Sequence, residues 1–76
     1  MKEVLEVLAK ALVDSPDDVS VTEVEGERET VLELRVAGDD MGKVIGKQGR
    51  IAKAIRTVVK AAASRENKRV MVEIVD

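Results

Sequence analysis

The sequence "VIGKQGR", residues 44–50, places two glycines around a lysine and a glutamine, with apolar residues before them and an arginine after them. Glycine adopts backbone conformations that other residues avoid, because it has no Cβ atom. Segments with helical patterns flank the tetrapeptide Gly46-Lys47-Gln48-Gly49 on both sides. The stretch therefore predicts a tight connection between two helices, and the fold is built around it.

The segment that follows Gly49 predicts a helix with an apolar side and a basic side. At roughly 100° per residue, the apolar arc holds Ile51, Ile55, Val58 and Ala62. The basic arc holds Lys53, Arg56 and Lys60. We expect the apolar arc to lie in the core and the basic arc to face water. On the other side of the glycines, Asp39-Asp40 are expected to cap a short helix over residues 41–45, which Gly46 ends.

The remaining segments predict one more helix and three strands. Leucines recur at helical spacing over residues 5–12, and Pro16 stops this helix near Val13. Residues 19–26 and 29–37 are rich in valine and threonine, and Gly26 marks a hairpin turn between them. Residues 70–75 alternate after a turn at residues 66–68 and predict the third strand.

The order α-β-β-α-α-β, with one apolar face on every element, fits a two-layer α+β domain spanning residues 1–76. We expect a three-stranded mixed sheet with three helices packed on one face. A mixed sheet requires the last strand to pair in parallel with the strand over residues 30–37, so that the helical pair becomes the crossover between them.

The composition excludes several classes of protein. A chain of 76 residues has room for one domain, and it contains no cysteine, no histidine and no aromatic residue. Because the commonest general base and the best nucleophile are absent, we expect neither an enzyme nor a cofactor. No apolar run approaches the length of a membrane span and no secretory signal is evident, so we expect no membrane partner and place the chain in the cytoplasm.

Other motifs with similar residues fail on spacing or have a simpler explanation. A P-loop needs one more residue between its glycines than Gly42 and Gly46 allow, and Gln48 stands where its hydroxyl residue belongs. Val44 occupies the central glycine position of a dinucleotide fingerprint. Capping and turn formation explain the paired acidic residues at 17–18 and 39–40, so we expect no metal site.

Charge is divided unevenly along the chain. The formal net charge is -2, but residues 41–60 hold six of the 13 basic residues and none of the 15 acidic ones. An acidic body with one concentrated cationic segment attracts an anionic partner to one face.

The glycine-flanked connection has the features of a phosphate-binding site. Unpaired backbone N–H groups at the start of the following helix attract anions, and Lys47 and Arg50 add positive charge. Missing Cβ atoms at Gly46 and Gly49 would let a sugar-phosphate backbone approach. The alternative is that both glycines merely turn the chain between packed helices, and the tetrapeptide alone does not separate the two.

The longer stretch "DDMGKVIGKQGRIAKAIRTVVKAAA", residues 39–63, resembles the type II KH domain, and most closely the KhpA family of small bacterial single-KH RNA-binding proteins. In KH domains the helix-GXXG-helix element clamps about four nucleotides of a single strand by their backbone. The resemblance implies binding of single-stranded RNA in post-transcriptional regulation, formation of a homodimer, and pairing with a KhpB-like protein. Single-stranded DNA is the alternative ligand, because KH loops hold either.

The resemblance also implies roles for single residues. Gly46 and Gly49 would admit the RNA backbone, and phosphates or sugars would be contacted by Lys47, Gln48 and Arg50. The groove under the bases would be floored by Val44, Ile45 and Ile51, although aliphatic residues at helical spacing beside a core are more often packing residues. Lys43 and Lys53 would flank the groove.

With no aromatic side chain on which to stack bases, we expect modest affinity, low sequence specificity and strong dependence on salt. The alternative function is a protein–protein interaction module that dimerises or docks on another chain and binds little nucleic acid. Its candidate interface is the small-residue run at positions 61–63.

Overall fold

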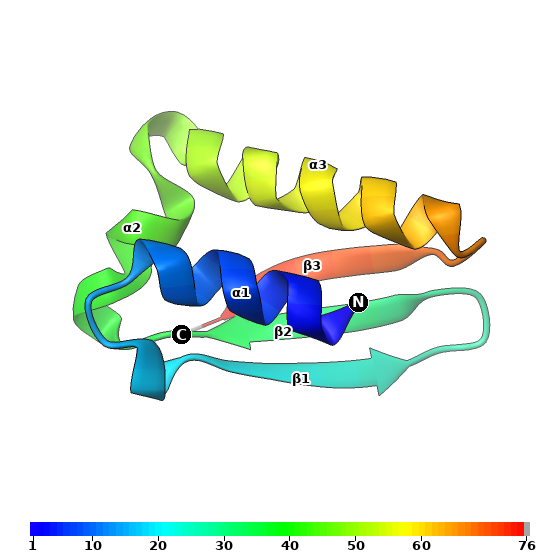
Figure 1. Ribbon diagram of the computed structural model, residues 1–76, viewed down its shortest axis with the longest axis horizontal. Coiled ribbons are helices and arrows are strands. Elements are labelled where there is room, and N and C mark those ends of the chain that lie inside the picture. Colours follow the sequence, from blue (N-terminus) through cyan, green and yellow to red (C-terminus); the bar gives the residue numbers. More distant parts are fainter. Residues whose placement is uncertain (76) are drawn as a thin grey trace.

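The computed structural model describes residues 1–75 and has the predicted order of elements, α-β-β-α-α-β (Figure 1). The helices are α1 (Lys2–Leu12), α2 (Met41–Ile45) and α3 (Arg50–Arg65). The strands are β1 (Ser20–Glu25), β2 (Thr30–Arg35) and β3 (Val70–Val75). Short 3-10 turns at Pro16–Asp18, Gly38–Asp40 and Lys47–Gly49 connect them.

The three strands form one mixed sheet in the order β1-β2-β3. β1 pairs antiparallel with β2, and β2 pairs in parallel with β3, so the predicted parallel pairing is confirmed. α2 and α3 form the crossover that this pairing requires, and all three helices lie on one face of the sheet (Figure 1). The predicted α+β class and two-layer arrangement are therefore confirmed, with β1 and β3 as the edges of the sheet.

Local sequence signals account for the boundaries of the first elements. α1 ends at Leu12, ahead of Pro16, as predicted. The N–H of Gly26 donates to the carbonyl oxygen of Glu29 at 2.8 Å and closes the hairpin between β1 and β2. Asn67, with a φ of 57°, turns the chain from α3 into β3.

Aliphatic side chains from both layers make the core, in which Leu5, Leu32 and Leu34 are fully buried. The other members of the buried cluster are Ala9, Val19, Val21, Val44, Ile55, Val59, Ala63, Val70 and Val72. Among residues 1–75, the structure contains no helix with the length and apolar character needed to cross a membrane.

The buried side of α3 differs from the prediction. Ala52, Ile55, Val59 and Ala63 are buried, whereas Val58 is 46% exposed and Ala62 is only partly buried. The predicted arc was therefore wrong at Val58, because the buried side of the helix is rotated toward Val59 and Ala63. Val59 and Ala63 are buried in place of Val58 and Ala62, while Ala54 and Ala61 are exposed. Lys53, Arg56 and Lys60 are exposed, as predicted.

Candidate nucleic-acid interface

The GXXG loop (residues 46–49) reverses the chain within four residues. The N–H of Gly46 donates to the carbonyl oxygen of Gly42 at 2.9 Å and ends α2, and the N–H of Gly49 donates to the carbonyl oxygen of Gly46 at 3.1 Å. Gly46, Gln48 and Gly49 have φ values of 76°, 59° and 73°. Gln48 is an uncommon case of a side-chain-bearing residue in the left-handed region, and this conformation was not predicted from the sequence.

The two glycines are needed for different reasons. A Cβ atom at Gly46 would lie 2.5 Å from Cγ1 of Ile51, so the side chain of Ile51 occupies that space. A Cβ atom at Gly49 would meet nothing within 4 Å. The bare Cα of Gly46 thus serves internal packing, and the open space that a sugar-phosphate backbone would need lies at Gly49.

Exposed polar side chains surround this open space. Lys47, Gln48 and Arg50 are all exposed, and Nη2 of Arg50 donates to Oε1 of Gln48 at 3.4 Å. Lys53 is exposed one turn along α3. Within residues 1–75, no carboxylate lies within salt-bridge distance of Lys47, Arg50 or Lys53. Their positive charge is therefore not neutralised inside the protein.

Lys43 is placed differently from these cations. Its Nζ lies 2.8 Å from Oδ2 of Asp14 and 3.2 Å from Oδ1 of Asp40. Two carboxylates thus already engage its ammonium group, on the side of α2 that faces the segment between α1 and β1.

The three aliphatic candidates differ in exposure. Val44 is fully buried, Ile51 is partly buried against Gly46, and Ile45 is 37% exposed. Val44 therefore supports the loop from the core, while Ile45 and Ile51 present apolar surface beside it.

Asp40 holds α2 in place by contacts that the sequence did not reveal. Its side chain is 2% exposed and accepts hydrogen bonds from the N–H groups of Asp14 at 3.2 Å and Ser15 at 3.0 Å. The predicted side-chain cap of α2 is therefore wrong, because this carboxylate turns toward the segment after α1. A five-residue helix is too short to persist alone, so α2 depends on Asp40 and on the buried Val44.

These contacts shift two pKa values in opposite directions. Burial pushes the pKa of Asp40 upward, but the hydrogen bonds from Asp14, Ser15 and Lys43 outweigh burial and leave this pKa below its ordinary value of 3.8. The hydrogen bonds to Asp14 and then Asp40 raise the pKa of Lys43 above 10.5 against the effect of burial. The pair is therefore charged across the neutral range.

The basic side of α3 faces the free edge of the sheet. Nε of Arg56 donates to the carbonyl oxygen of Val72 in β3 at 3.2 Å, which fixes this side chain against the edge strand. Lys53 and Lys60 lie on the same side of the helix. The sequence predicted that Lys53, Arg56 and Lys60 face water, but it did not predict the hydrogen bond from Arg56 to β3.

The family model described as the KhpA/KhpB KH domain matches residues 2–74. The chain is 71% identical over 75 residues to the RNA-binding protein KhpA of Clostridium acetobutylicum, covering 99% of this chain and 100% of that protein. It is 63% identical over 75 residues to RNA-binding protein KhpA of Caldanaerobacter subterraneus, with the same coverage, 99% and 100%. It is 53% identical over 76 residues to RNA-binding protein KhpA of Aquifex aeolicus, covering 100% and 96%.

Among solved structures, a crystal structure of a point variant of Aquifex aeolicus Era bound to GDP.AlF4- matches with a TM-score of 0.67 and 21% identity. The match covers 96% of this chain and 28% of the Era chain. It supports the fold alone.

Because Gly46 and Gly49 have different surroundings, replacing each one with alanine should change the free energy of unfolding by a different amount. Gly46→Ala introduces both a positive-φ side chain and a clash with Ile51, and we expect a loss of about 3 kcal/mol in the free energy of unfolding. Gly49→Ala introduces only the unfavourable φ, at about 1 to 2 kcal/mol. Urea denaturation of both variants measures the difference. Equal losses would contradict the packing role of Ile51.

The Asp40 and Lys43 contacts predict a pH dependence. The stabilisation from Asp40 is complete above its unfolded pKa and is lost as pH falls through its lower folded pKa. The stabilisation from Lys43 is complete below its unfolded pKa and is lost as pH rises through its higher folded pKa. Denaturation curves of wild type and Asp40→Asn should differ most between about pH 5 and 8 and converge in acid. A gap in stability that persists below the folded pKa of Asp40 would refute this role.

Proposed function

This chain belongs to the KhpA/KhpB KH-domain family, and from that membership we propose that it binds single-stranded RNA through the GXXG loop and the adjacent basic side of α3. The observation that carries the proposal is the open space at Gly49, bordered by the unneutralised cations Lys47 and Arg50. A phosphodiester is an anion that needs both close approach to a backbone and positive charge. The naming of the relatives for RNA binding supports the same ligand.

Each candidate residue has a part in this proposal. Phosphates approach Gly49 and the N-terminal end of α3, a 16-residue helix whose dipole favours negative charge at this end. Lys47, Gln48 and Arg50 contact phosphates or sugars, and Lys53 flanks the strand. Ile45 and Ile51 give the apolar surface for a sugar or base. The role of Gly46, Val44 and Lys43 is structural, because they hold the loop and α2 in position and do not contact the RNA.

Affinity in this proposal comes mainly from phosphate neutralisation. The chain has no aromatic side chain for stacking, so little distinguishes one base from another. The logarithm of the affinity should fall with the logarithm of salt concentration by about 0.7 for each phosphate contact. Single-stranded DNA carries the same phosphates, and a parallel titration with DNA of the same sequence tests how far the protein distinguishes the two.

We propose that the protein binds RNA and does not catalyse a reaction. We also propose that it acts in the cytoplasm, in the control of RNA after transcription. The sequence has no histidine or cysteine to serve as a general base or nucleophile, and the relatives are named for RNA binding.

Homodimer formation is the second part of the proposal and has its own surface. A groove of about 360 Å³ between α1 and α3 is lined almost wholly by apolar side chains. Its residues are Leu8, Ala11, Leu12, Arg50, Ile51, Ala54, Ile55 and Val58. The sequence pointed instead to positions 61–63, but Ala63 is buried in the core. In this proposal a second copy covers the groove. A KhpB-like protein, whose KH domain the same family description covers, would use the same face.

The RNA proposal predicts that Lys47→Asp combined with Gln48→Asp lowers affinity for mixed-sequence single-stranded RNA at least tenfold at low salt, because two carboxylates then face the phosphates. Fluorescence anisotropy measures the affinity. The melting temperature should change little, because both side chains are exposed.

A matched control is Lys10→Asp combined with Thr22→Asp, which changes the net charge equally on exposed positions of α1 and β1. This control should keep affinity within about threefold of wild type, since neither position belongs to the loop or to α3. Equal binding by the loop variant and wild type would favour the interaction module over RNA binding.

The dimer proposal predicts that Val58→Glu gives a monomer, because a charge in an apolar interface loses its hydration. Val24→Glu, on an equally exposed valine of β1, is the control and should leave the dimer intact. Light scattering coupled to size-exclusion chromatography reports the mass. A wild-type monomer, or a dimer that survives Val58→Glu, would contradict the groove as the interface.

A further inference from the structure

We propose that the RNA path continues from the GXXG loop along the β3 side of α3 to a second phosphate-binding site, formed by Lys60 and Arg69 at the far end of the helix. Its ligand is a phosphodiester of the same strand, beyond the nucleotides held by the loop. The inference rests on the proposed function and extends it.

The first support is the arrangement of charge on α3. Lys53, Arg56 and Lys60 are spaced by three and four residues, which places them in one row along the helix. All three are exposed. The opposite side of α3 carries Val58 and faces the apolar groove beside α1. The helix thus separates an apolar surface from a basic one, and the basic one starts at the loop.

The second support is the fixed position of Arg56 in the middle of this row. Its Nε is bonded to the carbonyl oxygen of Val72, on the edge strand β3. Because the guanidinium has further N–H donors, it still has donors for a phosphate while this bond holds it. A strand of RNA that leaves the loop therefore meets a positioned cation between α3 and β3.

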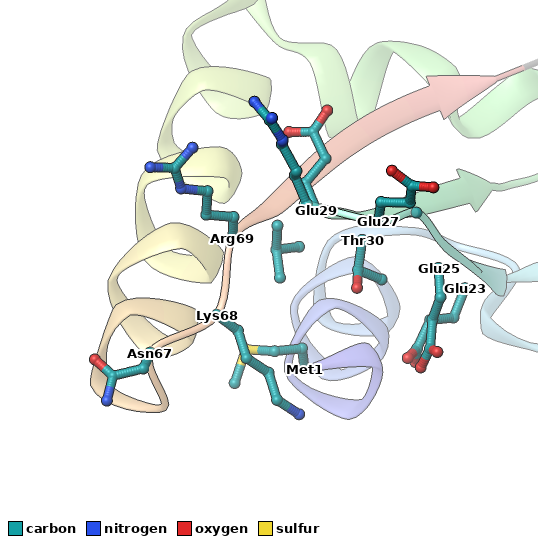
Figure 2. A pocket seen from close by; sticks show the side chains of 12 residues that line it. Met1, Glu23, Glu25, Glu27, Glu29, Thr30, Asn67, Lys68 and Arg69 are labelled. Carbon is teal, nitrogen blue, oxygen red and sulfur yellow. The ribbon is translucent and has the colours of Figure 1, made fainter.

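The third support is a groove of about 300 Å³ where the row ends. It is lined by Lys60 of α3, by Lys68, Arg69, Val70 and Met71 at the start of β3, and by Glu29. Figure 2 shows the side chain of Arg69 extending toward α3, while Lys68 points the other way, toward Met1. Arg69 and the helix that carries Lys60 thus face each other across the groove.

The charges of this groove are available to a ligand. Within the part of the chain that the structure describes, no carboxylate lies within 4.0 Å of the charged groups of Lys60 or Arg69. Lys68 is paired with Glu66 at 3.9 Å, so Glu29 is a single anion against the two cations Lys60 and Arg69, and the groove remains net positive. Met71, 42% exposed, adds an apolar surface of the kind that a sugar or base can cover.

The two sites are separated by most of α3. Eleven residues from Gly49 to Lys60 correspond to about 16 Å along a helix. A very short oligonucleotide held at the loop does not reach the far groove, whereas a longer one does. Dependence on oligonucleotide length is therefore the signature of the second site.

The test measures binding of four-nucleotide and ten-nucleotide oligouridylates to the full chain by fluorescence anisotropy. Lys60→Gln combined with Arg69→Gln should weaken binding of the ten-nucleotide RNA five- to tenfold and leave the four-nucleotide RNA unchanged. The salt slope for the longer RNA should fall by about 1.4, for two lost phosphate contacts. Lys10→Gln combined with Arg65→Gln removes the same charge elsewhere and should change neither affinity by more than about twofold.

Equal weakening of both lengths, or no weakening of either, would overturn the second site. A length effect that survives Lys60→Gln with Arg69→Gln would also overturn it, because the additional contact would then come from another surface, such as a second copy of the chain. If the second site is overturned, Lys47→Asp combined with Gln48→Asp still tests whether the loop binds RNA. If that variant still abolishes binding, the loop remains the RNA site.

Discussion

The contact between Ile51 and the bare Cα of Gly46 is the constraint on which the interface depends. Ile51 fills the space that any side chain at Gly46 would need, so the first residue of the loop is locked against the first turn of α3. With the chain reversed so tightly, Lys47 and Gln48 are exposed, and Gly49 lies at the start of α3, where the helix dipole favours negative charge. The N–H groups of Gly49 and Arg50 are bonded within the loop, to the carbonyl oxygens of Gly46 and Lys47. The chemistry proposed for the loop follows from a packing requirement beneath it.

α3 organises the rest of the molecule, because each of its sides has a different neighbour. Its buried side carries Ala52, Ile55, Val59 and Ala63, and the last three belong to the same core cluster as the strand residues. One flank borders the apolar groove beside α1, and the other carries cations over β3. The helix is thus a common wall for two proposed partners, a second copy and an RNA strand, and Arg50 and Ile51 in its first turn border both surfaces. Lys43 belongs to neither surface, since Asp14 and Asp40 hold it.

Most of the fold could be predicted because its signals are local. The alternation in residues 30–37 and 70–75, the hairpin turn at Gly26 and the end of α1 before Pro16 need no distant information. The prediction failed where a contact joins distant parts of the chain. Asp40 bonds to N–H groups 25 and 26 residues away, and Arg56 bonds to a carbonyl 16 residues away. The exposure of Val58 depends likewise on which side of α3 meets the sheet, and side-chain size does not determine that.

The most direct test of the central claim is an amide NMR titration of the protein with single-stranded RNA of mixed sequence. If the loop holds RNA, the resonances of Gly46, Lys47, Gln48, Gly49 and Arg50 shift together and saturate at one RNA concentration. If resonances elsewhere shift to saturation while these five stay in place, the glycine-flanked loop is not where this protein holds RNA.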